Sequence, residues 1–139
     1  MKKDKKPKYW IFVTDDTNWK IIKHRNIYGF NNRSKKYLDN LNEGDFIVMY
    51  IKGSKIGGLF KIKSLVCKSK LNFKSGVYPY KISLVKILIP KQMMNIKRIV
   101  QNISIFKGMK RWGGALMGKS VRELNRIDYF YIKEELKMG

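Results

Sequence analysis

The chain has 139 residues, 44% of them hydrophobic, a length and composition that suit one folded domain with an apolar core. A single cysteine and a single histidine exclude an internal disulfide and a four-ligand zinc site, so we expect no metal and no cofactor. Lysine and arginine number 31 against 10 aspartate and glutamate residues, a net charge of +21 that opposes the compact state by self-repulsion and attracts polyanions.

The N-terminal part predicts an arm, a strand and a helix. Residues 1–8 are basic and include a proline, so we expect a flexible arm ahead of a single domain over residues 9–139. Aromatic and β-branched residues in Tyr9–Thr14 predict a buried strand. Capping residues then open a short amphipathic helix with Trp19 and Ile22 on its inner face.

The next segments predict a loop, a short helix and a hairpin. Glycine and asparagine in Asn26–Arg33 favour a loop, and Ser34 is placed to cap a short helix with Leu38 and Leu41 inward. The remaining elements of this part are the turn Asn42–Asp45, the strand Phe46–Ile51, the hairpin turn Lys52–Lys55 and the returning strand Ile56–Ser64. Within the returning strand, Gly57-Gly58 indicates a bulge or a close backbone approach.

The C-terminal part predicts one long strand and one long helix. Its expected elements are the loop Asn72–Gly76, the strand Tyr80–Ile89, the helix Met94–Val100, the basic loop Lys107–Gly118, the strand or turn Val121–Leu124 and the helix Ile127–Lys137. Asn125 is placed to cap the last helix, with Ile127, Phe130, Tyr131 and Leu136 inward. Together the elements predict a small α+β domain around a curled sheet or barrel.

The excess of positive charge predicts a polyanionic partner. We favour nucleic acid, while an anionic membrane surface or an acidic protein are the alternatives that the same charge allows. No apolar run approaches the roughly 20 residues that span a bilayer, so we expect no membrane insertion. The charged start MKKDKKPK lacks the features of a secretion signal, and we therefore expect a cytoplasmic protein.

The segment Gly113–Ser120, GGALMGKS, matches the phosphate-binding loop pattern G-x-x-x-x-G-K-[ST]. In a nucleotide-hydrolysing domain that pattern follows a buried strand, whereas here the basic sequence KGMKRW precedes it. His24 has no nucleophile or acid at a spacing that would make a catalytic group of it. We expect a basic loop in which Lys119 contacts phosphate, and no enzymatic activity.

Aromatic residues interleaved with cations favour base stacking next to phosphate binding. The aromatic residues in this pattern are Tyr28, Phe30, Tyr78, Tyr80 and Trp112. The cations beside them that we predict to contact phosphate are Arg33, Lys35, Lys110 and Arg111. Each aromatic side chain has core packing as its alternative role, which we favour for Trp10, Phe12 and Trp19.

Several blocks in order resemble the EVE domain, a member of the PUA-like superfamily related to YTH domains. These blocks are YWIFVTDDTNW, NIYGF, GDFIVMYI, KIGGLFKI, YPYKISLVKI and RWGGALMGKSVREL. The resemblance implies a PUA-like β-barrel of about six strands with short helices around it. It also implies RNA or DNA binding, single-stranded or with a flipped base, and a pocket that accepts one modified base.

The resemblance also implies a base pocket around Tyr28. This tyrosine stands where YTH domains have a tryptophan that forms one wall of a cage around methylated adenine. Asn18, ten residues earlier, matches the polar residue that reads the base edge, and the Gly29 carbonyl matches the acceptor of the exocyclic amine. Arg111 matches a basic residue that binds phosphate. No tryptophan occurs between residues 20 and 111, so the candidates for the second wall are Tyr78, Tyr80 and Trp112.

We therefore predict a nucleic-acid-binding domain with a single-base pocket and a basic rim. RNA and DNA are both open, as are modified adenine and modified cytosine. One alternative is a protein or enzyme that uses the pocket for a small nucleotide-like ligand. Another is a structural protein of an RNA particle that binds without regard to the base.

Overall fold

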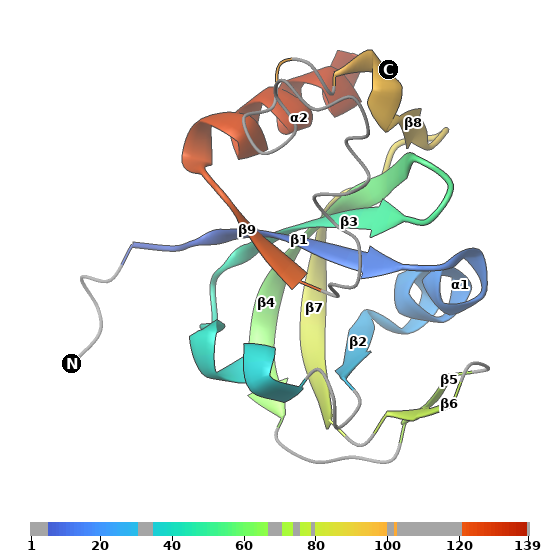
Figure 1. Ribbon diagram of the computed structural model, residues 1–139, viewed down its shortest axis with the longest axis vertical. Helices are drawn as coiled ribbons and strands as arrows, with labels where there is room; N and C mark the ends of the chain where they lie inside the picture. Colours follow the sequence, from blue (N-terminus) through green and yellow to red (C-terminus); the bar gives the residue numbers. More distant parts are fainter. Residues whose placement is uncertain are drawn as a thin grey trace.

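A curled mixed sheet forms the centre of the molecule, with strand order β2-β7-β4-β3-β1-β9 (Figure 1). The computed structural model describes residues 6–30, 35–66, 71–73, 76–78, 80–99, 102 and 121–138. The sheet strands are β1 (Tyr9–Thr14), β2 (Ile27–Phe30), β3 (Phe46–Ile51), β4 (Lys55–Val66), β7 (Tyr80–Leu88), β8 (Met94–Asn95), which pairs with β4, and β9 (Val121–Leu124). Strands β1 and β3 run parallel, while the other pairs in this sheet are antiparallel.

Two α-helices lie against the sheet. In Figure 1, α2 crosses its upper end, while α1 lies beside β2 and β3. The elements outside the sheet are α1 (Asp16–Arg25), α2 (Arg126–Met138), the 3-10 helices η1 (Lys35–Asn40) and η2 (Ile96–Arg98), and the separate pair β5 (Leu71–Phe73) and β6 (Gly76–Tyr78). This architecture confirms the predicted α+β domain built on a curled sheet of about six strands.

Both faces of the central strands are buried. Along β1, Trp10 and Phe12 enter one core cluster, which also takes in residues of α1 and β2. The alternate residues Tyr9 and Ile11 enter a second cluster, which is completed by α2. A strand with two buried faces needs an almost continuous apolar sequence, which explains why YWIFV was a clear strand signal.

The predicted loop over Asn26–Arg33 is wrong for its first part, because Ile27–Phe30 is strand β2. Asn26 adopts a left-handed conformation with φ of 57° and caps the C-terminal end of α1. The strand then forms by pairing with β7, where Tyr28 lies opposite Ile82, far along the chain. The glycine and asparagine residues of this segment carry no information about its pairing with β7.

Two other predictions in the middle of the chain need correction. The loop predicted over Asn72–Gly76 overlaps the short paired strands β5 and β6. The helix predicted over Met94–Val100 is replaced by β8 and the single 3-10 turn η2, since the register of β8 against β4 fixes an extended backbone there. The predicted strand Tyr80–Ile89 is confirmed as β7, and Val121–Leu124 is a strand, not a turn.

The last helix has the predicted cap and only part of the predicted inner face: Leu136 is buried and Tyr131 packs against the core. Asn125 Oδ1 accepts a hydrogen bond from Asp128 N over 2.7 Å, which confirms the cap. Ile127 and Phe130, however, are exposed by 80% and 38%. The buried residues are Asp128, Tyr129, Ile132 and Leu136. Apolar residues occur on several sides of this helix, and packing of Tyr129 on Tyr9 and Phe46 selects the buried side.

The Gly57-Gly58 pair confirms both the predicted bulge and the predicted close approach. The β3–β4 register shifts between Met49 and Tyr50, opposite this pair. A Cβ on Gly57 would lie 2.7 Å from Trp19 Cζ2, and a Cβ on Gly58 would lie 2.5 Å from Ile89 Cδ1. Glycine therefore lets α1 pack directly on β4.

Candidate nucleic-acid interface

Asn18 lies on the first turn of α1, buried to 6% exposure. The Asp15 side chain caps the helix by accepting a hydrogen bond from Asn18 N over 2.7 Å, and the acidic Asp16 suits the positive end of the helix dipole. The Asn18 side-chain oxygen Oδ1 is buried and accepts no hydrogen bond within the described part of the chain, although the residue has other contacts. Capping thus fixes the position of Asn18 on a rigid element.

Tyr28 lies on β2 and is 5% exposed. Its hydroxyl donates a hydrogen bond to the Val13 carbonyl over 2.7 Å, at the end of β1 just before α1 begins. Its ring lies 4.7 Å from the ring of Phe12 and 5.1 Å from that of Phe30, measured between centroids. The Tyr28 hydroxyl thus contacts the backbone two residues before Asp15, the cap of α1.

Two of the other predicted pocket residues, Gly29 and Phe30, lie on the same edge strand as Tyr28. Gly29 and Phe30 pair with Lys81 and Tyr80 across the β2–β7 ladder. Phe30 is fully buried against Phe12, whereas Tyr80 is partly buried and packs at the border of the core. Tyr78 belongs to β6. Trp112 lies outside the described residues, and so the composition of the pocket stays a prediction.

Most of the predicted phosphate contacts fall outside the described residues. These are Arg33, Lys110, Arg111 and Lys119; the sequence-predicted loop with the GGALMGKS pattern and the lone Cys67 lie outside them as well. Lys35 begins η1, next to the end of β2 in the chain. His24 is exposed in the last turn of α1.

A buried carboxylate ties the start of β1 to the start of β3. Asp45 is 2% exposed and accepts hydrogen bonds from Trp10 Nε1, Lys8 N and Asn42 N, each over 3.0 Å. Three donors on one carboxylate offset the cost of burying its charge. The sequence predicted Asp45 only as part of a turn, because two of its three donors, Lys8 N and Trp10 Nε1, belong to a segment far away in the chain.

A basic groove beside α1 was not anticipated from the sequence. It has a volume of about 530 Å³ and takes lysines from α1, from the β3–β4 hairpin and from the segment after β7. Each lysine is unremarkable in its own segment. Only the fold shows that they surround one hollow.

The described residues contain no group of three or more histidine, cysteine, aspartate and glutamate side chains placed to hold a metal ion. Within the same part of the chain, no helix is long and apolar enough to cross a membrane.

The curled sheet with α1 at one edge is the fold of YTH domains. The YTH domain of Zygosaccharomyces rouxii MRB1, solved in complex with N6-methyladenosine RNA, matches with a TM-score of 0.72 at 11% identity, covering 96% of this chain and 88% of that one. The Pho92 YTH domain in complex with m6A matches with a TM-score of 0.69 at 14% identity, covering 94% and 84%. These likenesses establish the fold class.

The chain belongs to the EVE domain family, whose model matches residues 8–135. A UPF0310 protein of Pyrococcus abyssi is 30% identical over 142 residues, covering 92% of this chain and 99% of that protein. A UPF0310 protein of Pyrococcus horikoshii is 30% identical over 145 residues, covering 92% and 98%. The family predicted from the sequence blocks is confirmed.

Proposed function

We propose that this protein binds nucleic acid and takes a single modified base into a pocket beside Asn18 and Tyr28. The observation that carries the proposal is the YTH fold over almost the whole chain, since YTH domains of this fold have been solved with N6-methyladenosine RNA. The net charge of +21 supplies attraction for phosphate. The role is one of binding, in the cytoplasm, and not of catalysis.

The position of the two residues supports the proposed pocket. Asn18 is held by the capped first turn of α1, and Tyr28 is held by its hydroxyl contact to Val13. A base reader needs such rigid positioning, because selectivity depends on a hydrogen bond to the base edge that is made at little entropic cost. Phosphate contacts would add affinity without adding base selectivity.

Binding should weaken steeply as salt concentration rises. Each phosphate neutralised on a single strand contributes about 0.7 to the slope of log K against log salt, so three contacts give a slope near −2. The measurement is the affinity for a short single-stranded RNA and the matching DNA over a salt series. A flat response, or no binding at low salt, contradicts the proposal.

Replacing Asn18 should remove base selectivity. We expect Asn18→Ala to erase a preference for the modified over the unmodified base, a loss of about 5- to 150-fold, since an unpaired polar edge costs about 1–3 kcal/mol. The probes are oligonucleotide pairs with N6-methyladenine against adenine and with methylcytosine against cytosine. The control Lys35→Ala should weaken binding to both members of a pair equally.

A folded Asn18→Ala variant with undiminished selectivity would place the pocket elsewhere. Two other results would favour other functions. A mononucleotide that binds as tightly as an oligonucleotide would favour a protein for a small nucleotide-like ligand. Wild-type binding that is blind to the base in every pair would favour a structural role on RNA.

A further inference from the structure

A groove runs between α1, the end of the β3–β4 hairpin and the segment that follows β7. Its lining includes Trp19, Lys23, Lys55, Lys91, Met93 and Asn95. Its volume of about 530 Å³ lies within the range of about 300–1,000 Å³ that ligand sites commonly have. We call it the α1 groove.

The walls of the α1 groove are held by backbone contacts. Strand β8 pairs with β4 so that Asn95 lies opposite Lys55, and Ile96 N donates a hydrogen bond to the Ser54 carbonyl over 2.8 Å. On the other side, the missing side chain of Gly57 lets Trp19 pack on β4. The groove is therefore a fixed feature of the fold and not a gap between loose side chains.

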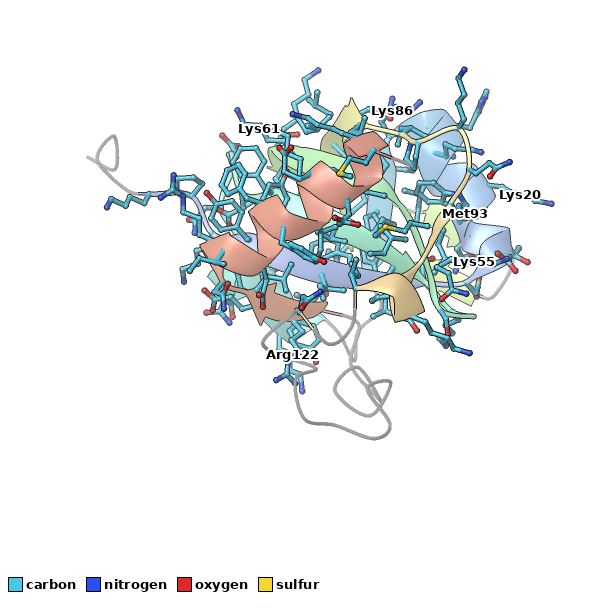
Figure 2. All side chains as sticks on the ribbon, turned by 90° about the horizontal axis from the view of Figure 1, so that it is seen from above. Lys20, Lys55, Lys61, Lys86, Met93 and Arg122 are labelled. Atoms are coloured by element: carbon cyan, nitrogen blue, oxygen red, sulfur yellow. The ribbon has the colours of Figure 1, made fainter. Side chains whose placement is uncertain are left out.

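The charge of the α1 groove has one sign. Lys23, Lys55 and Lys91 line it from three different segments, and none of the described residues in its lining is acidic. Lys23 is positioned over the indole of Trp19, with Nζ 5.8 Å from the ring centroid. Figure 2 shows Lys20, Lys55 and Met93 at the end of the molecule where α1 lies, with Lys61 well away from them.

A second hollow differs from the α1 groove in the charges that line it, and this difference indicates which kind of ligand the groove suits. It has a volume of about 600 Å³, and its lining combines Lys6 and Lys61 with Glu43 and Asp45. The carboxylates balance the lysines there, whereas the α1 groove has three cations and no carboxylate among the residues described. Uncompensated lysines beside apolar surface, such as the 40% exposed Met93, suit a chain of phosphates with sugars and bases attached.

We propose that the α1 groove holds the phosphate backbone of the strand whose base enters the pocket beside Asn18. This inference rests on the proposed function and extends the footprint of the strand beyond one nucleotide. Asn18 and Trp19 are consecutive residues of α1, and their side chains point about 100° apart around the helix, so the strand would pass around the first turn of α1 from one site to the other. The groove supplies affinity that depends on oligonucleotide length, and the base pocket supplies selectivity.

The test compares two double variants that lose the same charge. Lys55→Ala with Lys91→Ala removes two groove cations, while Lys63→Ala with Lys137→Ala removes two exposed lysines outside the groove. With a single-stranded 12-mer, the groove variant should reduce the salt slope by about 1.4, two contacts at about 0.7 each. The control variant should leave the slope unchanged. Both double variants should bind a trimer that carries the preferred base with the same affinity as the wild type.

Each other outcome is decisive. A 12-mer slope that is equal in the wild type and the groove variant overturns the groove but leaves the base pocket intact. Equal losses in the groove variant and the control assign the effect to overall charge and also overturn it. A glutamate 12-mer that displaces the oligonucleotide at equal concentration would assign the groove to acidic peptides. Failure of the wild type to bind any oligonucleotide would contradict the proposed function itself.

Discussion

Tyr28→Ala is expected to lower the free energy of unfolding by about 3–5 kcal/mol, the usual cost of truncating a buried aromatic side chain. The Tyr28 ring packs against Phe12 and Phe30, and its hydroxyl donates to the Val13 carbonyl over 2.7 Å. Domains of this size have a net stability of about 5–15 kcal/mol, so the variant stays partly or mostly folded with a much reduced midpoint in urea.

The control for this prediction is Tyr28→Phe, which keeps the ring and removes only the hydrogen bond to the Val13 carbonyl. It should cost about 1 kcal/mol, and it should keep any selectivity that depends on stacking. Comparing base selectivity in the phenylalanine variant with that in Tyr28→Leu then separates stacking from stability. A loss below about 1 kcal/mol for Tyr28→Ala would show that the ring is not part of the core.

Asp45→Ala should be destabilised by about 3–5 kcal/mol, because three donors lose a common buried acceptor. The donors are Trp10 Nε1, Lys8 N and Asn42 N. Each buried donor left unsatisfied costs about 1–3 kcal/mol, and the new cavity lets water offset part of that cost. Chemical unfolding of the purified variant measures the change.

Two further variants serve as comparisons for Asp45→Ala. Asp39→Ala removes the same charge from an exposed position of η1 and should change stability by less than about 0.5 kcal/mol. Trp10→Phe removes one donor and keeps the carboxylate, so its loss should be clearly smaller than that of Asp45→Ala. Equal stability of Asp45→Ala and Asp39→Ala would mean that the buried carboxylate does not join β1 to β3.

These two stability predictions bear on function because both residues hold the strand that precedes α1. Tyr28 connects β2 to the end of β1, and Asp45 connects the start of β1 to β3. Both connections hold the strand that leads into α1, the helix that carries Asn18. A binding defect in either variant is therefore informative only after its stability has been measured.

Local chemistry was sufficient for several elements. The strands β1 and β3 follow from uninterrupted apolar residues, and α1 follows from its aspartate cap and its inward Trp19 and Ile22. The bulge at Gly57 follows from a pair of glycines within a strand pattern. Each of these signals comes from residues that are near one another in the chain, so the sequence is sufficient to predict it.

The inner face of α2 was predicted incorrectly at Ile127 and Phe130 for an identifiable reason. Apolar residues are distributed around the helix, so both the Ile127–Phe130 side and the Tyr129–Ile132 side satisfy a helical period. The choice depends on aromatic partners on β1 and β3. Ring centroids of Tyr9 and Tyr129 lie 4.8 Å apart, and this contact exists only after the sheet has formed.

The sequence by itself determined the class of protein: a basic chain of the EVE family, with capped helices and apolar strands. Composition and local pattern carry that information because net charge, capping and strand propensity need no distant partner. Only the tertiary structure decided that Ile27–Phe30 is a strand, that Asp45 has three donors, and that lysines from three segments line the α1 groove. The pairing of β2 with β7 and the register of β8 on β4 join residues far apart in the chain, and contacts of that kind have no local signal.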